Sequence, residues 1–332
     1  FRAANLIVGN DENTPALEAT IFGPTLKFEE DTIIAITGAN LNPSIDNVYL
    51  DNWTAIPVSK GSELSFSNPD SGLRAYIAFA GGISVDSIDC VMGSYSTYVP
   101  GGFGGLSGRA LIAGDTLQIN YQDSTDYQAL KSKTVKDYPT FDSECVLRIL
   151  SGPQDNYFPA DAIDFLLQNE YTVSVDSDSV GIRLEGESLI HDGAVKMISA
   201  GTAFGTIQIP GDGLPIILMS NRGTSGGYLK IATVISADHC KLAQLMPGTK
   251  LRFSLTTYEE AIEELRIQER KLDSLREIHS KNVPTKITAS DLLVSVADES
   301  GNILSDKLDS QTILAKVKFG EDIEEIKIDI GD

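Results

Sequence analysis

The sequence predicts an all-β protein of two related domains, followed by one helix and a small β appendage. Between positions 17 and 66, short apolar runs alternate with polar residues and are interrupted by Gly, Pro, Asn and Asp, as in the short strands of a sandwich or a barrel. A turn that leads into a strand recurs as KGSELSF, AGDTLQI and PGTKLRF, which indicates that one domain ends near position 119 and another near 253. Beyond position 257 the apolar spacing becomes helical.

Composition limits the partners and the location of the chain. With 332 residues and a formal charge of −21, it is long enough for two domains and too acidic for nucleic-acid binding, which needs clustered Lys and Arg. The sequence has no apolar run of transmembrane length and no signal-peptide pattern, so we expect no membrane partner and a cytoplasmic location. Cys90, Cys145 and Cys240 are far apart and lack C-x-x-C spacing, and we therefore expect neither a disulfide framework nor a metal site.

Changes in composition along the chain set the predicted domain boundaries. A polar stretch with few aliphatic residues and a proline marks an exposed linker between the two β-domains. We assign the first β-domain to 1–120, the linker to 121–143, the second β-domain to 144–256, an amphipathic helix to 257–281 and the β appendage to 282–332.

Helical spacing is predicted in two places, and a hairpin in the appendage. Over 258–280, apolar residues lie three and seven positions apart among Glu, Lys and Arg, so this segment is an amphipathic helix with Thr256 or Thr257 as its N-cap. It either packs on the β-domains or binds a partner chain, and we favour packing. Two alternating runs around Gly320 predict the hairpin. A short helix in the second domain is indicated by apolar residues on one face: Ala162, Ile163, Leu166 and Leu167.

Glycine is concentrated between Ala80 and Asp115. Each glycine costs folding entropy, so their concentration needs a reason. One reason is a string of turns between short strands, and the other is a loop whose bare N–H groups face a ligand. Neither G-x-G-x-x-G after a strand nor G-x-x-x-x-G-K-[ST] occurs here, so the loop has no support as a nucleotide-binding motif.

A second stretch of functional interest runs from Gly205 to Lys230. An apolar strand at 215–219 is followed by hydroxyl groups, bare backbone amides, a phenol and the cations Arg222 and Lys230. This set suits a cradle for an anion or a carbonyl group, and an ordinary polar turn would share it. The sequence offers no competing hydrolytic machinery, because its three histidines are dispersed and the G-x-S-x-G motif is absent.

Five segments carry a resemblance to a known family. They are GSYSTYVPGGFGGLSGRAL (93–111), SGPQDNYF (151–158), EYTVSVDSDSVGIRLEG (170–186), AFGTIQIPGDGLPIILMSNRGTSGGYLKIATVISAD (203–238) and PGTKLRF (247–253). On these motifs the chain, from residue 1 to about 265, resembles the biotin-dependent carboxyltransferase family, also called allophanate hydrolase subunit 2. That family includes the C-type subunit of 5-oxoprolinase, the carboxyltransferase region of urea carboxylase and Kip-type antagonists of a sporulation kinase inhibitor.

The resemblance implies a fold and a set of site residues. The fold is two cyclophilin-like β-barrel domains in tandem, and we expect the first barrel to lack a strand and a glycine-rich loop that precede Ala3 in the family. The two functional stretches would converge on one pocket. The resemblance gives catalytic roles to Arg109, Lys230, Thr224 and Tyr228, and substrate-binding roles to Ser94, Ser96, Thr97, Gln208, Ser225, Gly226 and Gly227.

Within this implied site, the backbone around Gly226 and Gly227 would stabilise an oxyanion, while Lys230 and Arg109 hold anionic groups. The sequence departs from the family pattern at four positions. One departure removes an Arg fork, a bidentate carboxylate clamp, and so affects substrate identity more than fold. The departures are Tyr95, Gly223, Ser225 and Leu229, where the family has Arg, Gln, Thr and Pro.

The resemblance also implies a function. We expect one subunit of an ATP-dependent 5-oxoprolinase that opens the lactam of 5-oxo-L-proline to L-glutamate. Its partners would be a homologue of the B-type subunit of 5-oxoprolinase (allophanate hydrolase subunit 1 or Kip inhibitor type) and a lactam-utilisation subunit. ATP would be bound by the complex rather than by this chain alone. The alternatives are a biotin-dependent carboxyltransferase of the urea carboxylase type and a non-catalytic Kip-type antagonist. Because the A-M-K-M biotinylation motif is absent, any biotin would have to arrive on another chain.

Overall fold

The structure is a computed structural model that describes residues 1–120, 134–141, 143–189, 198–280, 312–319 and 322–329, without the side chains of 277–280 and of all residues from 312 on. It divides into two units, Phe1–Asn282 and Val283–Asp332. In the described part of the chain, no helix is long and apolar enough to cross a membrane. The three cysteines are free.

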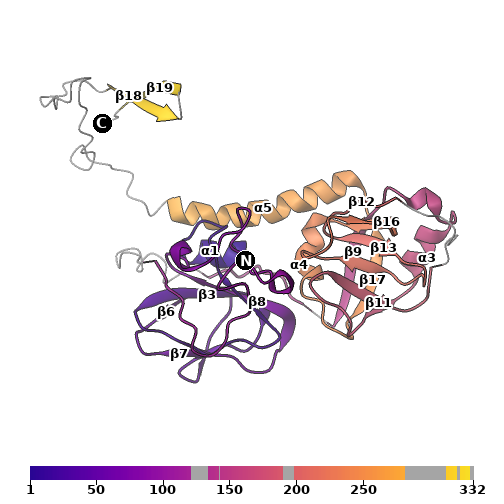
Figure 1. Ribbon diagram of the computed structural model, residues 1–332, viewed down its shortest axis with the longest axis horizontal. Helices are drawn as coiled ribbons and strands as arrows, with labels where there is room; N and C mark the ends of the chain where they lie inside the picture. Colours follow the sequence, from indigo (N-terminus) through magenta and orange to yellow (C-terminus); the bar gives the residue numbers. More distant parts are fainter. Residues whose placement is uncertain (121–133, 142, 190–197, 281–311, 320–321, 330–332) are drawn as a thin grey trace, which may run out of the picture. The chain divides into compact units, whose positions relative to one another are not determined.

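Two four-stranded sheets form the first β-domain (Figure 1). The first sheet has the order β1-β8-β3-β6 and consists of β1 (Leu17–Thr20), β3 (Thr32–Asn40), β6 (Ala55–Val58) and β8 (Ser71–Phe79). The second has the order β2-β7-β4-β5 and consists of β2 (Leu26–Lys27), β4 (Ser44–Ile45), β5 (Val48–Tyr49) and β7 (Glu63–Ser65). Single 3₁₀ turns lie at Val85–Ser87 and Val99–Gly101.

Strand β3 is buried on both faces, which explains its nearly continuous apolar sequence. Because side chains alternate along a strand, Ile34 and Ile36 pack into the core between the two sheets. Ile33 and Ala35 point the other way and pack against helix α1 (Arg2–Ile7). The helix and the second sheet therefore cover the two faces of the central strand.

The second β-domain is a closed barrel with the order β10-β11-β14-β13-β16-β9-β17. Its interior is filled by one cluster of buried apolar side chains that includes Leu147, Tyr171 and Ile207. The small pair β12 (Ala200–Gly201) and β15 (Ser225–Gly226) lies outside the barrel ladder. The barrel strands are β9 (Glu144–Ser151), β10 (Tyr171–Val173), β11 (Gly181–Glu185), β13 (Thr206–Ile209), β14 (Ile216–Leu218), β16 (Leu229–Val234) and β17 (Lys250–Leu255). The helices are α3 (Ala162–Gln168) and α4 (His239–Leu242), with 3₁₀ turns at Asp155–Tyr157 and Ser236–Asp238.

A mostly β fold and a barrel in the second half are confirmed, whereas the predicted pair of tandem barrels is not. Among the described residues, the first-domain strands stay in two separate sheets. The strands β2, β4 and β5 span only two residues each, and the isolated bridges of the segment between 80 and 119 all join residues within that segment. These short pairings do not close the first domain into a single ladder.

The glycine-rich stretch of the first domain packs on itself. Gly108 has a φ of +66°, and a Cβ there would lie 2.2 Å from the carbonyl carbon of Gly102. At Gly104, with a φ of +77°, a Cβ would lie 2.2 Å from the carbonyl oxygen of Ser96. Only glycine permits both the left-handed backbone and this close approach. The turn alternative of the sequence analysis accounts for these glycines.

The predicted helices and hairpin are confirmed. Helix α3 covers the predicted short helix, and α5 (Tyr258–Ser280) covers the amphipathic one. Thr257 is its N-cap: its Oγ1 accepts the N–H of Glu260 at 3.2 Å, and Glu260 Oε2 accepts the N–H of Thr257 at 3.0 Å, which is a reciprocal capping box. In unit 2, β18 (Thr312–Phe319) and β19 (Asp322–Asp329) form an antiparallel pair.

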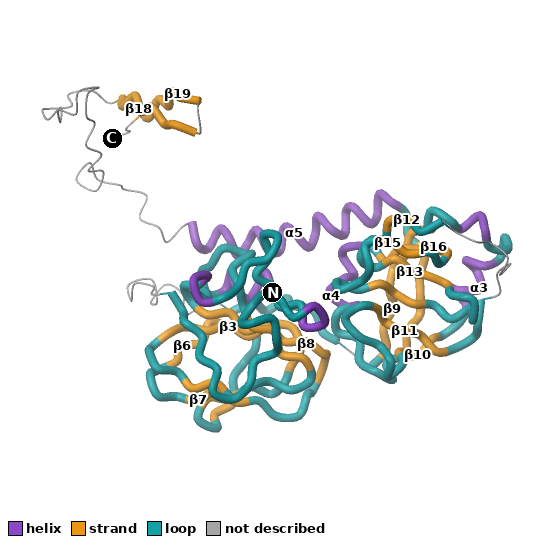
Figure 2. Tube along the Cα trace, viewed as in Figure 1, coloured by secondary structure: helices purple, strands orange, loops and turns teal. Residues whose placement is uncertain are grey.

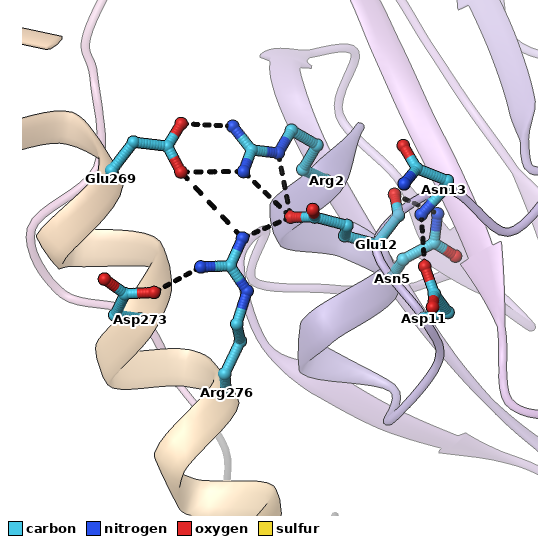
Figure 3. Close-up of polar contacts among 8 residues, drawn as sticks. All are labelled: Arg2, Asn5, Asp11, Glu12, Asn13, Glu269, Asp273 and Arg276. Atoms are coloured by element: carbon cyan, nitrogen blue, oxygen red, sulfur yellow. Dashed lines mark hydrogen bonds and ion pairs between the residues drawn. The ribbon is translucent and has the colours of Figure 1, made fainter. Parts of the chain in front are cut away.

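Helix α5 packs on both β-domains, as Figures 1 and 2 show. On the first domain it is held by charged side chains (Figure 3). Arg2 Nη1 of α1 lies 2.5 Å from Glu269 Oε1 of α5, and its Nη2 lies 2.9 Å from Glu12 Oε2. Arg276 of α5 pairs with the same Glu12 carboxylate. The packing that the sequence analysis favoured is therefore present, with ion pairs as its main polar contacts.

On the second domain, α5 is held through Arg148 of β9. The Arg148 Nη1 atom lies 3.1 Å from Glu264 Oε2 of α5. The same guanidinium donates to Asp238, whose side chain is completely buried. Asp238 also accepts from Lys241 Nζ at 3.1 Å. One ionic cluster thus joins a barrel strand, the segment before α4 and the long helix.

Gln244 connects the two β-domains directly. Its buried side chain accepts the N–H groups of Leu73 and Arg74 of β8 at 2.7 and 2.8 Å, and donates to the carbonyl of Arg74 at 2.8 Å. A single amide therefore bonds the backbone of β8 where the pairing of β3 with β8 is interrupted between Gly38 and Asn40. Such fully satisfied buried hydrogen bonds fix a unique packing geometry.

Candidate functional site

A row of four side chains crosses the outer face of the barrel. In β11, β14 and β13, every second residue points into the core: Ile182, Ile217 and Ile207. The residues beside them face outward, and the strand register places them directly opposite one another. The row consists of Arg183 opposite Ile216, Ile216 opposite Gln208, and Gln208 opposite Lys230.

A β-bulge brings Lys230 into this row. The register of β13 and β16 changes from Ile207 opposite Ala232 to Gln208 opposite Lys230, so that Ile231 is the extra residue. Bulges of this kind redirect side chains and are frequent beside functional sites. Without the bulge, Ile231 would lie opposite Gln208 and Lys230 would not belong to the row.

A cavity of about 280 Å³ lies over the row, and Ser225 and Gly226 of β15 are among the residues that line it. At Gly226 a Cβ would lie 2.5 Å from Gln208 Nε2, so a larger residue would displace the amide. The φ of Gly226 is not in the left-handed region, so the role of this glycine is to leave room for the Gln208 amide in its present position. The lining residues are Asp178, Val180, Gly181, Arg183, Thr202, Gln208, Ile216, Leu218, Gly223, Ser225, Gly226 and Tyr228.

Two buried donors in this region have no partner. Lys230 is 2% exposed and Gln208 is 5% exposed, and among the described residues neither Lys230 Nζ nor Gln208 Nε2 has a hydrogen-bond acceptor. A buried donor left unpaired costs about 1–3 kcal/mol. Gln208 and Lys230 occupy opposite positions of β13 and β16, and Gln208, but not Lys230, lines the cavity. One oxygen-rich group that reached both donors could satisfy both. Their chemistry fits a carbonyl, a carboxylate or a carbamate, all of which offer acceptor oxygens.

The segment after β9 fixes the backbone of Lys230. Gln154 Oε1 accepts the N–H of Lys230 at 2.9 Å, and the N–H of Gln154 donates to the Lys230 carbonyl at 3.3 Å. Strand β9 has ended at Ser151, so the Gln154 side chain continues the ladder where no strand remains. A Cβ at Gly152 would lie 2.3 Å from the Lys230 carbonyl oxygen, which requires glycine there.

Replacing Gln154 by Ala should therefore leave a buried N–H without an acceptor. We expect the free energy of unfolding to fall by about 1–3 kcal/mol, measured by urea denaturation. Gln168→Ala, an exposed glutamine of α3, is the matched control and should change stability by less than about 0.5 kcal/mol. Equal effects of the two substitutions would contradict the role given to Gln154.

The second-domain residues that the sequence analysis selected lie in or beside this region. Gln208, Ser225, Gly226 and Tyr228 line the cavity. Thr224 and Gly227 are exposed neighbours in the same turn. Arg222 instead directs its guanidinium to the carbonyls of Thr202 and Met219, at 3.5 and 3.3 Å.

The first-domain residues form a separate group. Arg109 makes a bidentate pair with Asp115, at 2.7 and 2.8 Å. Hydrogen bonds from Arg109, and from the N–H of Ile112, lower the pKa of the Asp115 carboxyl to about 2. In the part of the chain that the structure describes, no hydrogen bond or ion pair links these residues, or Ser94, Ser96 and Thr97, to the cavity on the barrel.

A second, larger cavity of about 980 Å³ lies between the first domain and residues of 134–141, with Ser143 also in its lining. Trp53 and Tyr138 stack at its wall, with ring centroids 5.2 Å apart and an angle of 3° between their planes. None of the residues selected from the sequence lines it. We therefore place the candidate site at the smaller cavity.

Sequence reasoning missed Arg183 and Gln154. Both lie within segments that carry the family resemblance, GIRLEG and SGPQDNYF. Alternation in GIRLE puts Arg183 on the face opposite to Ile182. What the sequence does not contain is the strand order that places this face beside Gln208.

Comparison with known proteins supports the same relationship along most of the chain. The family described as carboxyltransferase domain, subdomain A and B, matches residues 1–255. The C-type subunit of 5-oxoprolinase from Escherichia coli (strain K12) is 36% identical over 286 residues, covering 85% of this chain and 88% of that protein. The protein of the same name from Haemophilus influenzae is 33% identical over 278 residues, covering 84% of this chain and 87% of that protein.

A solved structure shows the same fold. The crystal structure of the K. lactis urea amidolyase matches with a TM-score of 0.74 and 28% sequence identity. The match covers 83% of this chain and 18% of the much longer urea amidolyase. The sequence motifs, the barrel and the extent of the match lead to one conclusion: the chain belongs to the carboxyltransferase-domain family, subdomain A and B.

Proposed function

We propose that the chain is a cytoplasmic subunit of an ATP-dependent 5-oxoprolinase, which opens the lactam of 5-oxo-L-proline to give L-glutamate. The observation that carries the proposal is the pair of buried, unpartnered donors, Lys230 Nζ and Gln208 Nε2, beside a cavity within the described residues. The similarity to the C-type subunits of 5-oxoprolinase from Escherichia coli and Haemophilus influenzae directs the choice of substrate.

The donors suit the chemistry of a lactam. An amide carbonyl resists attack, and its oxygen gains negative charge when the carbon is attacked. Donors that are already in place and shielded from water stabilise this charge without reorganising. We assign this role to Lys230 and Gln208, with Gly226 leaving room for the amide, and with Ser225, Tyr228 and the neighbouring Thr224 and Gly227 at the cavity mouth. Arg109 remains a proposed anion-binding residue of the first domain.

The chain is proposed to act only in a complex. ATP would supply the phosphoryl group that activates the lactam, and we assign its binding to the partners, because the sequence has no phosphate-loop motif. The proposed partners are a homologue of the B-type subunit of 5-oxoprolinase and a lactam-utilisation subunit. The donor pair would equally hold the carboxylate of a carboxylated biotin brought by another chain. Carboxyl transfer to urea, the alternative that the likeness to urea amidolyase favours, therefore uses the same residues.

Reconstitution tests the proposal. The purified chain should release no glutamate from 5-oxoproline and ATP, and addition of both partners should produce glutamate and ADP. The parallel assay supplies urea, bicarbonate, ATP, a biotin carboxylase and a biotinylated carrier. Turnover in the urea assay and none with 5-oxoproline would favour the carboxyltransferase assignment over the oxoprolinase assignment. Glutamate release by the chain without partners would refute its role as a subunit.

A further inference from the structure

We propose that Arg183 recognises a carboxylate of the substrate, so that the cavity selects lactams that bear a carboxylate over neutral amides. The inference rests on the proposed function and extends it to a residue that has no role in it. Arg183 stands at one end of the row across the barrel, and Lys230 stands at the other.

The spacing of the row matches an extended ligand with two polar ends. Adjacent strands lie about 4.8 Å apart, so the backbones of Arg183 and Gln208, two strands apart, are separated by roughly 10 Å. The long Arg183 side chain shortens this gap and is among the residues that line the cavity. Between the two polar ends lies Ile216, with Leu218 beside it on the same strand.

This order of groups defines a ligand class. An anionic group would lie at Arg183, apolar ring atoms over Ile216 and Leu218, and a carbonyl oxygen at Gln208 and Lys230. A cyclic amide with a carboxylate carries these three parts in one small molecule. Urea has neither an anionic group nor apolar ring atoms, so it would leave the Arg183 end of the row without a partner.

Arg183 is free to take this role. Arg148, Arg222 and Arg252 of the second domain all direct their guanidinium groups to protein acceptors. Within the described residues, the Arg183 side chain has no hydrogen bond or ion pair, and its backbone N–H donates to Ser177 Oγ at 3.0 Å. A planar guanidinium binds a carboxylate through two parallel hydrogen bonds.

One negative side chain lines the same cavity and has to be considered. Asp178 Oδ1 accepts the N–H groups of Val180 and Gly181, at 2.8 and 3.1 Å. These bonds hold the carboxylate in the turn before β11 and partly offset its charge. An anionic ligand at Arg183 would therefore find the guanidinium donors of Arg183 unused, whereas Oδ1 of the Asp178 carboxylate already accepts two backbone N–H groups.

The test compares two ligands that differ only in the carboxylate. In the reconstituted complex, 5-oxoproline is used as the substrate, and 2-pyrrolidinone, the same lactam without the carboxylate, is tested as a competitive inhibitor. Arg183→Gln should raise KM for 5-oxoproline about tenfold to a hundredfold and leave the inhibition constant of 2-pyrrolidinone unchanged. Arg183→Lys should lie between the two, because a point charge replaces the fork. Arg252→Gln, an exposed arginine paired with Glu170, is the matched control and should change neither constant.

The outcomes separate this inference from the proposed function. If Arg183→Gln weakens the binding of both lactams equally, or of neither, Arg183 does not recognise the carboxylate. Equal binding of the two lactams by the unmodified complex would also overturn the inference. If Lys230→Met retains full activity, the role given to Lys230 fails, and if the complex acts on urea and not on 5-oxoproline, the proposed function itself fails.

Discussion

Lys230→Met is expected to lower kcat/KM of the reconstituted complex about a hundredfold without destabilising the chain. The substitution removes a donor that would act on the charge developing at the carbonyl oxygen, so kcat should fall together with kcat/KM. Methionine fills a similar volume, and it removes a polar group that is 2% exposed and unpartnered among the described residues. The free energy of unfolding should stay constant or rise by about 1 kcal/mol.

A loss of activity without a loss of stability distinguishes a functional lysine from a structural one. Steady-state kinetics and urea denaturation should be measured on the same preparations. Lys250→Met, an exposed lysine of β17 that pairs with Glu170 at 3.1 Å, is the matched control and should leave activity intact. A loss of stability in Lys230→Met that parallels the loss of activity would make Lys230 a structural residue.

Much of the fold follows from local signals in the sequence. Helix α5 was predictable because its apolar spacing, its cap at Thr257 and the acidic residues of its first turn agree with one another. The barrel strands have alternating or fully apolar sequences bounded by turns. The first domain was harder to predict, because strands of two residues, such as β2 and β4, carry too little pattern to decide between a barrel and two sheets.

The candidate site was predictable only in part. Residues that follow one another in a turn, such as Ser225 and Gly226, share a composition that suggests a cradle. The pairing of Gln208 with Lys230 depends on a bulge at Ile231, and the neighbourhood of Arg183 depends on the order of four strands. Long-range register is not encoded in any short segment, so neither relation can be obtained from spacing alone.

The ionic cluster at Asp238 gives the largest expected effect on stability. Asp238→Asn should lower the free energy of unfolding by about 3 kcal/mol, because Asp238 is completely buried and accepts from Arg148 and Lys241. The amide that replaces the carboxylate cannot accept on both sides, so the Arg148 guanidinium is left without its counter-charge. Asp273→Asn on α5, whose side chain is 56% exposed, is the matched control and should cost less than about 1 kcal/mol.

The difference between the wild type and Asp238→Asn should depend on pH. Burial alone would raise the pKa of the Asp238 carboxyl, but the hydrogen bonds from Arg148 and Lys241 outweigh burial and lower it below its ordinary value of 3.8. A lowered folded-state pKa contributes stability that is fully present above the unfolded value and is lost as the pH falls through the folded value. Urea denaturation at pH 7 should therefore show the full difference, and denaturation below pH 3.8 a smaller one. A difference that stays constant from neutral to acidic pH would mean that the charge of Asp238 does not stabilise the contact between the barrel and α5.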